Sequence, residues 1–161
     1  MSWPEIMRES PEDFDEWFRE KHSRPPPWCR LLDDDEVEDL AWRISHRLGS
    51  PARRLETALR LVRDRLPLSE HDATHMGWTE PLSEAAPRYG FHRTELVLYV
   101  PESPEARGRP VPNVVEIRLA DLIEFEKTLW WDNSFLIDSG GAWVAWGPHD
   151  HACRVLRLRG P

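Results

Sequence analysis

The spacing of apolar residues changes once along the chain, and this change constrains the fold more than any other feature. Up to residue 66, apolar side chains recur every three or four positions, which is the spacing of one helix face. From residue 93 they gather in short runs rich in β-branched and aromatic side chains, which is typical of strands. We therefore predict one α+β domain over residues 1–161, with a helical part at 10–66, a connecting loop at 67–92 and a strand-rich part at 93–159.

Helix-end signals delimit the first part. We predict helices at 11–21, at 34–48 and from Ser50-Pro51 to Leu66. Ser10 can cap the first helix, Asp33 and Glu36 have capping-box spacing at the second, and Gly49 ends the second. The short link at Gly49 implies that the second and third helices form a hairpin. Arginines on the third helix should then lie near the acids of the second helix or of the N-terminus.

The second part is predicted to form a sheet. Expected strands lie at 95–100, 114–119, 134–137, 143–146 and 153–158, with a further helix at 121–129. Asp138 to Gly141 has the composition of a hairpin turn. Prolines interrupt 67–92, which we expect to be a loop with one helical turn at most. The fold should be N-terminal helices packed on a mostly antiparallel sheet of about five strands.

Charge is distributed unevenly. The net charge is −8, and residues 5–39 hold 13 acids and 5 bases, which is −8, whereas the remainder holds 16 of each. Such a region repels nucleic acid and anionic lipid and attracts a basic protein partner. The alternative is a solvated acidic face with a helix N-terminus. The candidate partner-binding acids are Asp33, Asp34, Asp35, Glu38 and Asp39.

Compartment is indicated by features that the sequence lacks. No stretch approaches the roughly 20 apolar residues of a membrane span, and the N-terminal residues lack the apolar segment of a signal peptide. The two cysteines, Cys29 and Cys153, are too few for a disulfide framework or a zinc site of their own. We expect a cytoplasmic protein that binds neither membrane nor nucleic acid.

The nine tryptophans are the outlier in composition. Residues 143 and 146 of one strand point to opposite faces, and the adjacent Trp130 and Trp131 should also diverge. Trp131 and Trp146 are therefore candidate outward-facing anchors for a partner. The alternative is that helices and loops cover both faces of the sheet.

Histidines offer the weak candidates for a metal site, namely His71, His75, His149 and His151. Histidine is a common ligand of zinc and iron, and such a cluster would suit a metal-dependent enzyme. No HExxH or paired CxxC motif supports this. Histidines without a metal remain the competing interpretation, and no cofactor is expected.

The C-terminal part resembles a known class of proteins. Leu129 to Ile137 (LWWDNSFLI) is followed by a glycine turn, by Trp143-Val144-Ala145-Trp146 and by His149-Asp150. This pattern resembles small immunity proteins of bacterial polymorphic-toxin systems, over about 30 of the 161 residues. The resemblance implies a protein that binds and blocks a toxin without catalysing a reaction, and it transfers no site residues.

Two functions from different classes follow. The first is a non-catalytic binding protein, an immunity-type inhibitor whose acidic N-terminal region engages a basic toxin domain. The alternative is a metal-dependent enzyme that uses the histidine cluster. A regulatory or structural domain of a larger assembly is a third possibility.

Overall fold

A computed structural model describes residues 3, 7, 8, 10–101, 113–129 and 133–158. Six of the described strands form one antiparallel sheet in the order β1-β4-β3-β5-β6-β8. Their bounds are β1 Cys29–Leu31, β3 Leu96–Val100, β4 Val115–Arg118, β5 Phe135–Asp138, β6 Trp143–Trp146 and β8 Arg154–Arg157. The predicted α+β class and antiparallel pairing are confirmed, and β1 is a further strand that the sequence did not predict.

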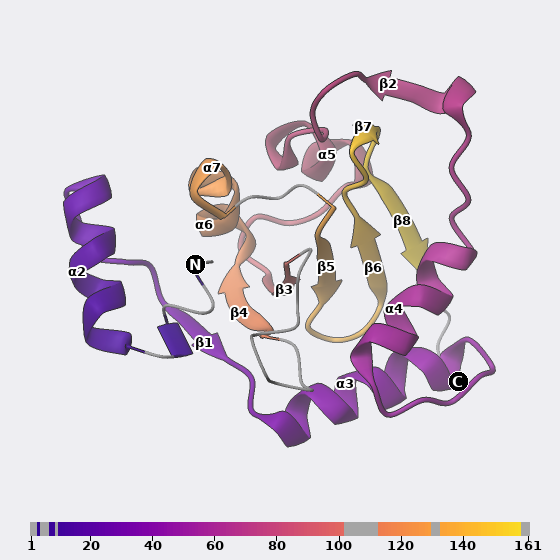
Figure 1. Cartoon of the computed structure of the whole chain (residues 1–161), viewed down its shortest axis with the longest axis horizontal. Coiled ribbons are helices and arrows are strands. Elements are labelled where there is room, and N and C mark those ends of the chain that lie inside the picture. The colour runs from indigo at the N-terminus through magenta and orange to yellow at the C-terminus, as the bar shows by residue number, and fades with distance from the viewer. Residues whose placement is uncertain (1–2, 4–6, 9, 102–112, 130–132, 159–161) are drawn as a thin grey trace.

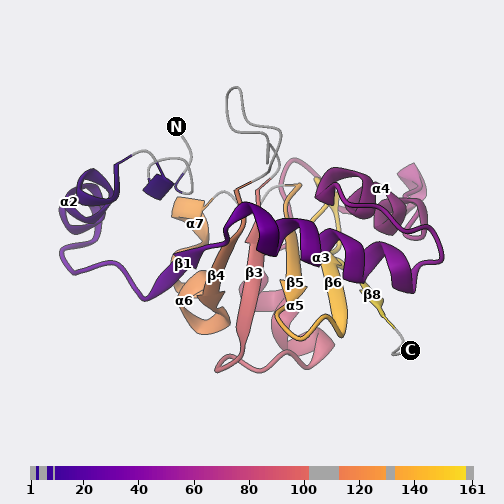
Figure 2. The ribbon, with the colours of Figure 1, turned by 90° about the horizontal axis from the view of Figure 1, so that it is seen from below.

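Helices cover both faces of this sheet (Figures 1 and 2). Their bounds are α2 Pro11–His22, α3 Asp34–Arg47, α4 Leu55–Asp64, α5 Leu82–Tyr89, α6 Leu119–Glu124 and α7 Glu126–Leu129. The apolar sides of α3 and α4 pack on one face, and those of α2, α5 and α6 pack on the other. No helix in the described part of the chain is both long and apolar enough to cross a membrane.

Successive side chains along a strand point alternately to the two faces of the sheet and so contribute to the apolar core on each face. In β6, Trp143 lies in the core under α5, whereas Val144 lies in the core under α3 and α4. Trp146 follows Val144 and stacks on Phe135, with ring centroids 6.2 Å apart. Strands buried on both faces read as continuous apolar runs rather than as alternating ones. The two tryptophans of β6 therefore diverge, as expected, and each finds a covered face.

The start of α3 follows the sequence signals closely. The Asp33 carboxylate accepts a hydrogen bond from the backbone N–H of Glu36, and the Glu36 carboxylate accepts one from the N–H of Asp33. Gly49 follows the helix with a positive φ of 77°, a conformation that glycine adopts without steric cost. At α2 the expected cap is wrong, because the Ser10 hydroxyl donates to the Asp13 carboxylate, 2.6 Å away, and makes no cap hydrogen bond.

The third helix begins later than expected, at Leu55 instead of Ser50-Pro51. The buried Ser45 hydroxyl accepts from the Ala52 N–H at 2.7 Å and donates to the Ala52 carbonyl at 3.0 Å. These bonds hold the chain against α3 as a loop, with Arg53 and Arg54 at its end. The expected hairpin of two helices is confirmed, since α3 and α4 pack together in one core.

Residues 67–92 are more structured than the expected loop. They contain the short strand β2 (Ala73–His75) and α5, which has Pro87 inside it. Leu82, Ala85 and Ala86 of α5 are buried in the core, so packing outweighs the hydrogen bond that proline removes. β2 pairs with β7 (Asp150–His151) in a separate two-stranded sheet.

The predicted helix at 121–129 is also corrected, because it begins at Leu119 and divides at Phe125 into α6 and α7.

Candidate partner-binding site

The outward face of α3 carries a stripe of acidic and aromatic side chains. Asp35, Glu38, Asp39 and Trp42 recur at helical spacing and are exposed. The opposite side of the helix is buried in the core, through Val37, Leu40, Ala41 and Ile44. Because that inner side fixes the rotation of the helix, the stripe must face solvent.

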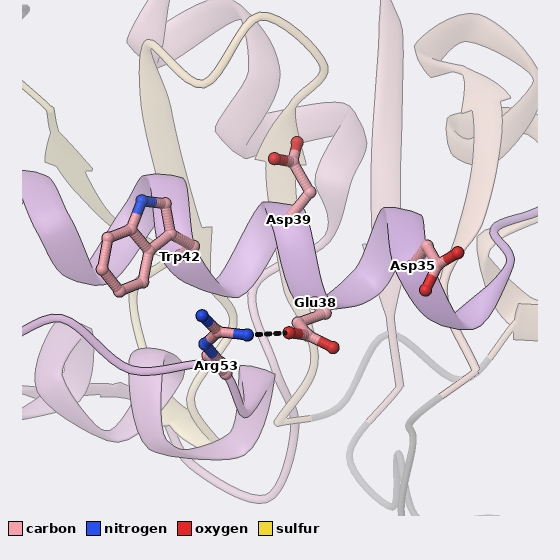
Figure 3. A pocket seen from close by; sticks show the side chains of 5 residues that line it. All are labelled: Asp35, Glu38, Asp39, Trp42 and Arg53. Atoms are coloured by element: carbon pink, nitrogen blue, oxygen red, sulfur yellow. Dashed lines mark hydrogen bonds and ion pairs between the residues drawn. The ribbon is translucent and has the colours of Figure 1, made fainter.

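A hollow of about 310 Å³ lies along this stripe (Figure 3). It is lined by Asp35, Glu38, Asp39 and Trp42 of α3 and by Arg53 of the loop that leads into α4. Ligand pockets in proteins span about 300–1,000 Å³. The hollow therefore has room for one side chain or a small group, and its lining carries three acids and one base, a formal charge of −2.

The carboxylates of the hollow are held only loosely. Glu38 pairs with Arg53 at 3.0 Å, and Asp39 pairs with Arg43 at 3.1 Å. Asp35 has no ion pair within the part of the chain that the structure describes. Both ion pairs are well exposed, and exposed pairs contribute about 0–1 kcal/mol. A charged partner can therefore replace them at little cost.

Trp42 brings apolar surface into this acidic setting. Its side chain is 43% exposed, and its ring stacks on that of His46 with centroids 5.8 Å apart. Cations do lie over other rings of the described chain, for example Lys21 over Trp17. Among the described residues no cation lies over Trp42, so part of its aromatic surface remains available to a partner.

The other predicted acids lie at the N-terminal end of α3 and do not line the hollow. Asp33 caps the helix, and Asp34 is exposed in the first turn. Glu36 is fixed further by Arg30 of β1, whose Nη1 lies 2.7 Å from its carboxylate. The hydrogen bond from Arg30, with help from the backbone N–H of Asp33, lowers the pKa of Glu36 to about 2. The acids of α2 form a separate group, because α2 lies away from α3 in both views (Figures 1 and 2).

The two predicted tryptophans are placed differently. Trp131 lies outside the described residues, and Trp146 is partly buried against Phe135. The well exposed tryptophans of the described chain are Trp28, Trp42 and Trp78. Of these, only Trp42 lines the hollow beside the predicted acids. Its helical spacing from Asp35 and Asp39 could have revealed it, whereas the place of Arg53 depends on the loop after α3.

The four candidate metal-binding histidines come from two segments that the fold brings together. β2 pairs with β7, so that His75 faces Asp150 and Ala73 faces His151. The His151 ring is engaged by the backbone carbonyls of His149 and Ser69, at 2.8 and 3.1 Å, and the His75 ring by the Thr74 hydroxyl at 2.8 Å. Among the described residues, no three His, Cys, Asp or Glu side chains are grouped to hold a metal ion.

The two cysteines do not provide a reactive thiol. Cys29 and Cys153 are free and far apart in the fold, in β1 and next to β8. Burial raises the pKa of the Cys29 thiol to about 11 and that of the Cys153 thiol to about 12. Since the thiolate is the nucleophile, neither side chain is prepared for catalysis.

Comparisons with known proteins suggest no function, so the functional assignment rests on the hollow on α3. The sequence matches no protein-family model, and neither the curated proteins nor the solved structures include a match to it.

Proposed function

We propose that the chain is a non-catalytic binding protein that recognises a basic protein partner through the hollow on α3. The observation that carries this proposal is an exposed tryptophan that lines the same hollow as Asp35, Glu38 and Asp39. Tryptophan is enriched at the energetic centre of interfaces. Carboxylates around it would steer a basic partner into place and reject acidic ones.

The finer form of the proposal is an immunity-type inhibitor that acts in the cytoplasm on a bacterial toxin domain. It is supported by the sequence resemblance and by the acidic character of the N-terminal region. Part of the resembling segment, Trp130 to Asp132, lies outside the described residues. The remainder forms β5, the turn at Gly141 and β6, and leads to His149 and Asp150.

The experiment begins with partner capture by crosslinking in the native host, followed by affinity measurement with the purified partner. Reversal of two charges in the hollow, D35K/D39K, should weaken binding at least about tenfold and flatten its salt dependence. The matched control is E16K/E20K on α2, which changes the charge equally on two exposed acids away from the hollow. The control should retain most of the affinity.

Two outcomes contradict the proposal. Equal weakening by both double variants would show that net charge acts without a site, and unchanged affinity of D35K/D39K would remove α3 as the interface. For the finer form, co-expression with the partner should restore growth that the partner alone arrests. A partner that is harmless when expressed alone would exclude the toxin inhibitor while leaving the binding protein in place.

A further inference from the structure

Arg53 places a guanidinium group of the chain itself in the acidic hollow. Its Nη1 lies 3.0 Å from Oε1 of Glu38, and the side chain is 77% exposed. Figure 3 shows this group directed from the loop toward Glu38, with Trp42 and Asp35 on opposite sides of Glu38 along the helix and Asp39 pointing away from Arg53. Two of the three carboxylates of the hollow are thus already paired with a guanidinium in weak and accessible ion pairs, Glu38 with Arg53 and Asp39 with Arg43.

We propose that the hollow is a recognition site for an arginine side chain of a partner, and that Arg53 competes with that side chain for Glu38. This inference rests on the proposed function and specifies the chemistry that the same site reads. The incoming guanidinium would stack on the indole of Trp42 and donate to Glu38 in place of Arg53, and Asp35 and Asp39 would add negative charge to the same hollow. Arg53 would keep part of the negative charge neutralised until a partner arrives.

The arrangement of the stripe favours arginine over lysine. Asp35 and Asp39 are one helical turn apart, and Trp42 follows Asp39 by three residues, so an aromatic face and carboxylates are neighbours. A guanidinium is planar, stacks on aromatic faces and donates several hydrogen bonds within one plane, whereas an ammonium is a compact and strongly hydrated charge. An indole is also the ring that binds cations best.

The size and charge of the hollow limit what it accepts. A volume of about 310 Å³ has room for a single side chain. The formal charge of −2 from Asp35, Glu38, Asp39 and Arg53 disfavours phosphate and other anions. Removal of the Arg53 charge would change the lining to −3, which would strengthen the attraction for a cation.

The test uses the whole chain and two capped tripeptides, Ac-Gly-Arg-Gly-NH2 and Ac-Gly-Lys-Gly-NH2. Binding is followed by two-dimensional NMR of the indole N–H signals, with the Trp42 signal assigned from W42F. We expect the arginine peptide to shift the Trp42 signal in a saturable manner and to bind at least about threefold more tightly than the lysine peptide.

Variants separate the site from general electrostatics. D35N/D39N and W42A should each weaken arginine-peptide binding at least about threefold, whereas R53Q should strengthen it by about twofold or more. The matched control is R60Q, which removes another exposed arginine paired with a glutamate, Glu56 at 3.3 Å. R60Q changes the net charge as R53Q does, but Arg60 does not line the hollow, so R60Q should leave peptide binding close to that of the unmodified chain.

Equal binding of the two peptides, or equal gains from R53Q and R60Q, would overturn the inference. So would arginine binding that leaves the Trp42 signal unchanged. These failures are distinct from failure of the proposed function: if D35K/D39K still abolishes binding of the captured partner, the interface stands and only the arginine assignment falls. Arginine-selective binding at Trp42 without any captured protein partner would support the arginine assignment and leave the proposed function without its partner.

Discussion

Among the described residues, Glu80 is the one charged residue that is buried, and its side chain is 3% exposed. Its carboxylate is bound by Arg88 Nη2, at 2.7 and 2.5 Å from the two oxygens, and by the backbone N–H of Cys153 at 2.6 Å. Arg88 and Tyr89 also donate to the carbonyl of Cys153. One side chain thus ties the segment before α5 to the residue before β8.

Substitution of Glu80 by glutamine should destabilise the chain by about 2 kcal/mol, because it leaves Arg88 without its charged partner and weakens the bond from Cys153. The value stays below that of a fully buried pair, since the Arg88 side chain is 45% exposed. Urea denaturation of the E80Q variant measures it. The control is E84Q, at an exposed position of α5, which should change stability by less than about 0.5 kcal/mol. Equal midpoints for E80Q and the unmodified chain would contradict this account.

At the scale of elements, the N-terminus of α3 decides where the acidic stripe lies. The capping box of Asp33 and Glu36 fixes the first turn, and Arg30 joins Glu36 to Glu116 of the neighbouring strand β4. α3 is therefore anchored to the sheet at the end where Asp35 lies, and Trp42 follows two helical turns further along the same helix. A surface that is held by its own helix end needs little reordering on binding, which favours affinity.

The lowered pKa of Glu36 makes this anchor sensitive to acid. A folded-state pKa of about 2, against the ordinary 4.5, means that its stabilisation is complete above pH 4.5 and is lost as the pH falls toward 2. Urea midpoints between pH 6 and 2 should therefore fall less steeply for E36Q than for the unmodified chain. R30Q removes the largest cause of the shift and should flatten the profile similarly. A slope that neither variant changes would show that the bond to Arg30 does not set this pKa.

At the scale of the whole molecule, the central sheet is covered on both sides and the small β2–β7 sheet is not. β3 is paired on both edges, and Val97 to Val100 are buried against both helical layers. β2 and β7 hold only intermediate or exposed residues, and Met76 and Trp78 beside them are exposed. Local opening is easier where few apolar side chains are buried.

Amide hydrogen exchange should report this difference directly. We expect the amides of β3 to exchange only through global unfolding, and those of β2 and β7 to exchange at least about a hundredfold faster. NMR-detected exchange at neutral pH measures both sets in one sample. Similar protection in β2 and β3 would show that the small sheet is an integral part of the cooperative core.

The sequence predicted those features of the fold that depend on interactions between residues close together in the chain. The capping box places the start of α3, Gly49 marks its end, and the turn from Asp138 to Gly141 joins β5 to β6 as expected. The acidic excess was visible as well, because charge requires only counting. The helical spacing of Asp35, Asp39 and Trp42 was present in the sequence too.

Tertiary structure alone decided what depends on distant partners. β1 pairs with β4 across more than 80 residues, and α5 keeps Pro87 because burial of Leu82 and Ala85 compensates for the lost hydrogen bond. Arg53 reaches Glu38 only because Ser45 holds the loop before α4 against α3. The choice of which distant segments pair or pack together leaves no local pattern, so the sequence supplied the acids of the hollow and the packed fold supplied its shape.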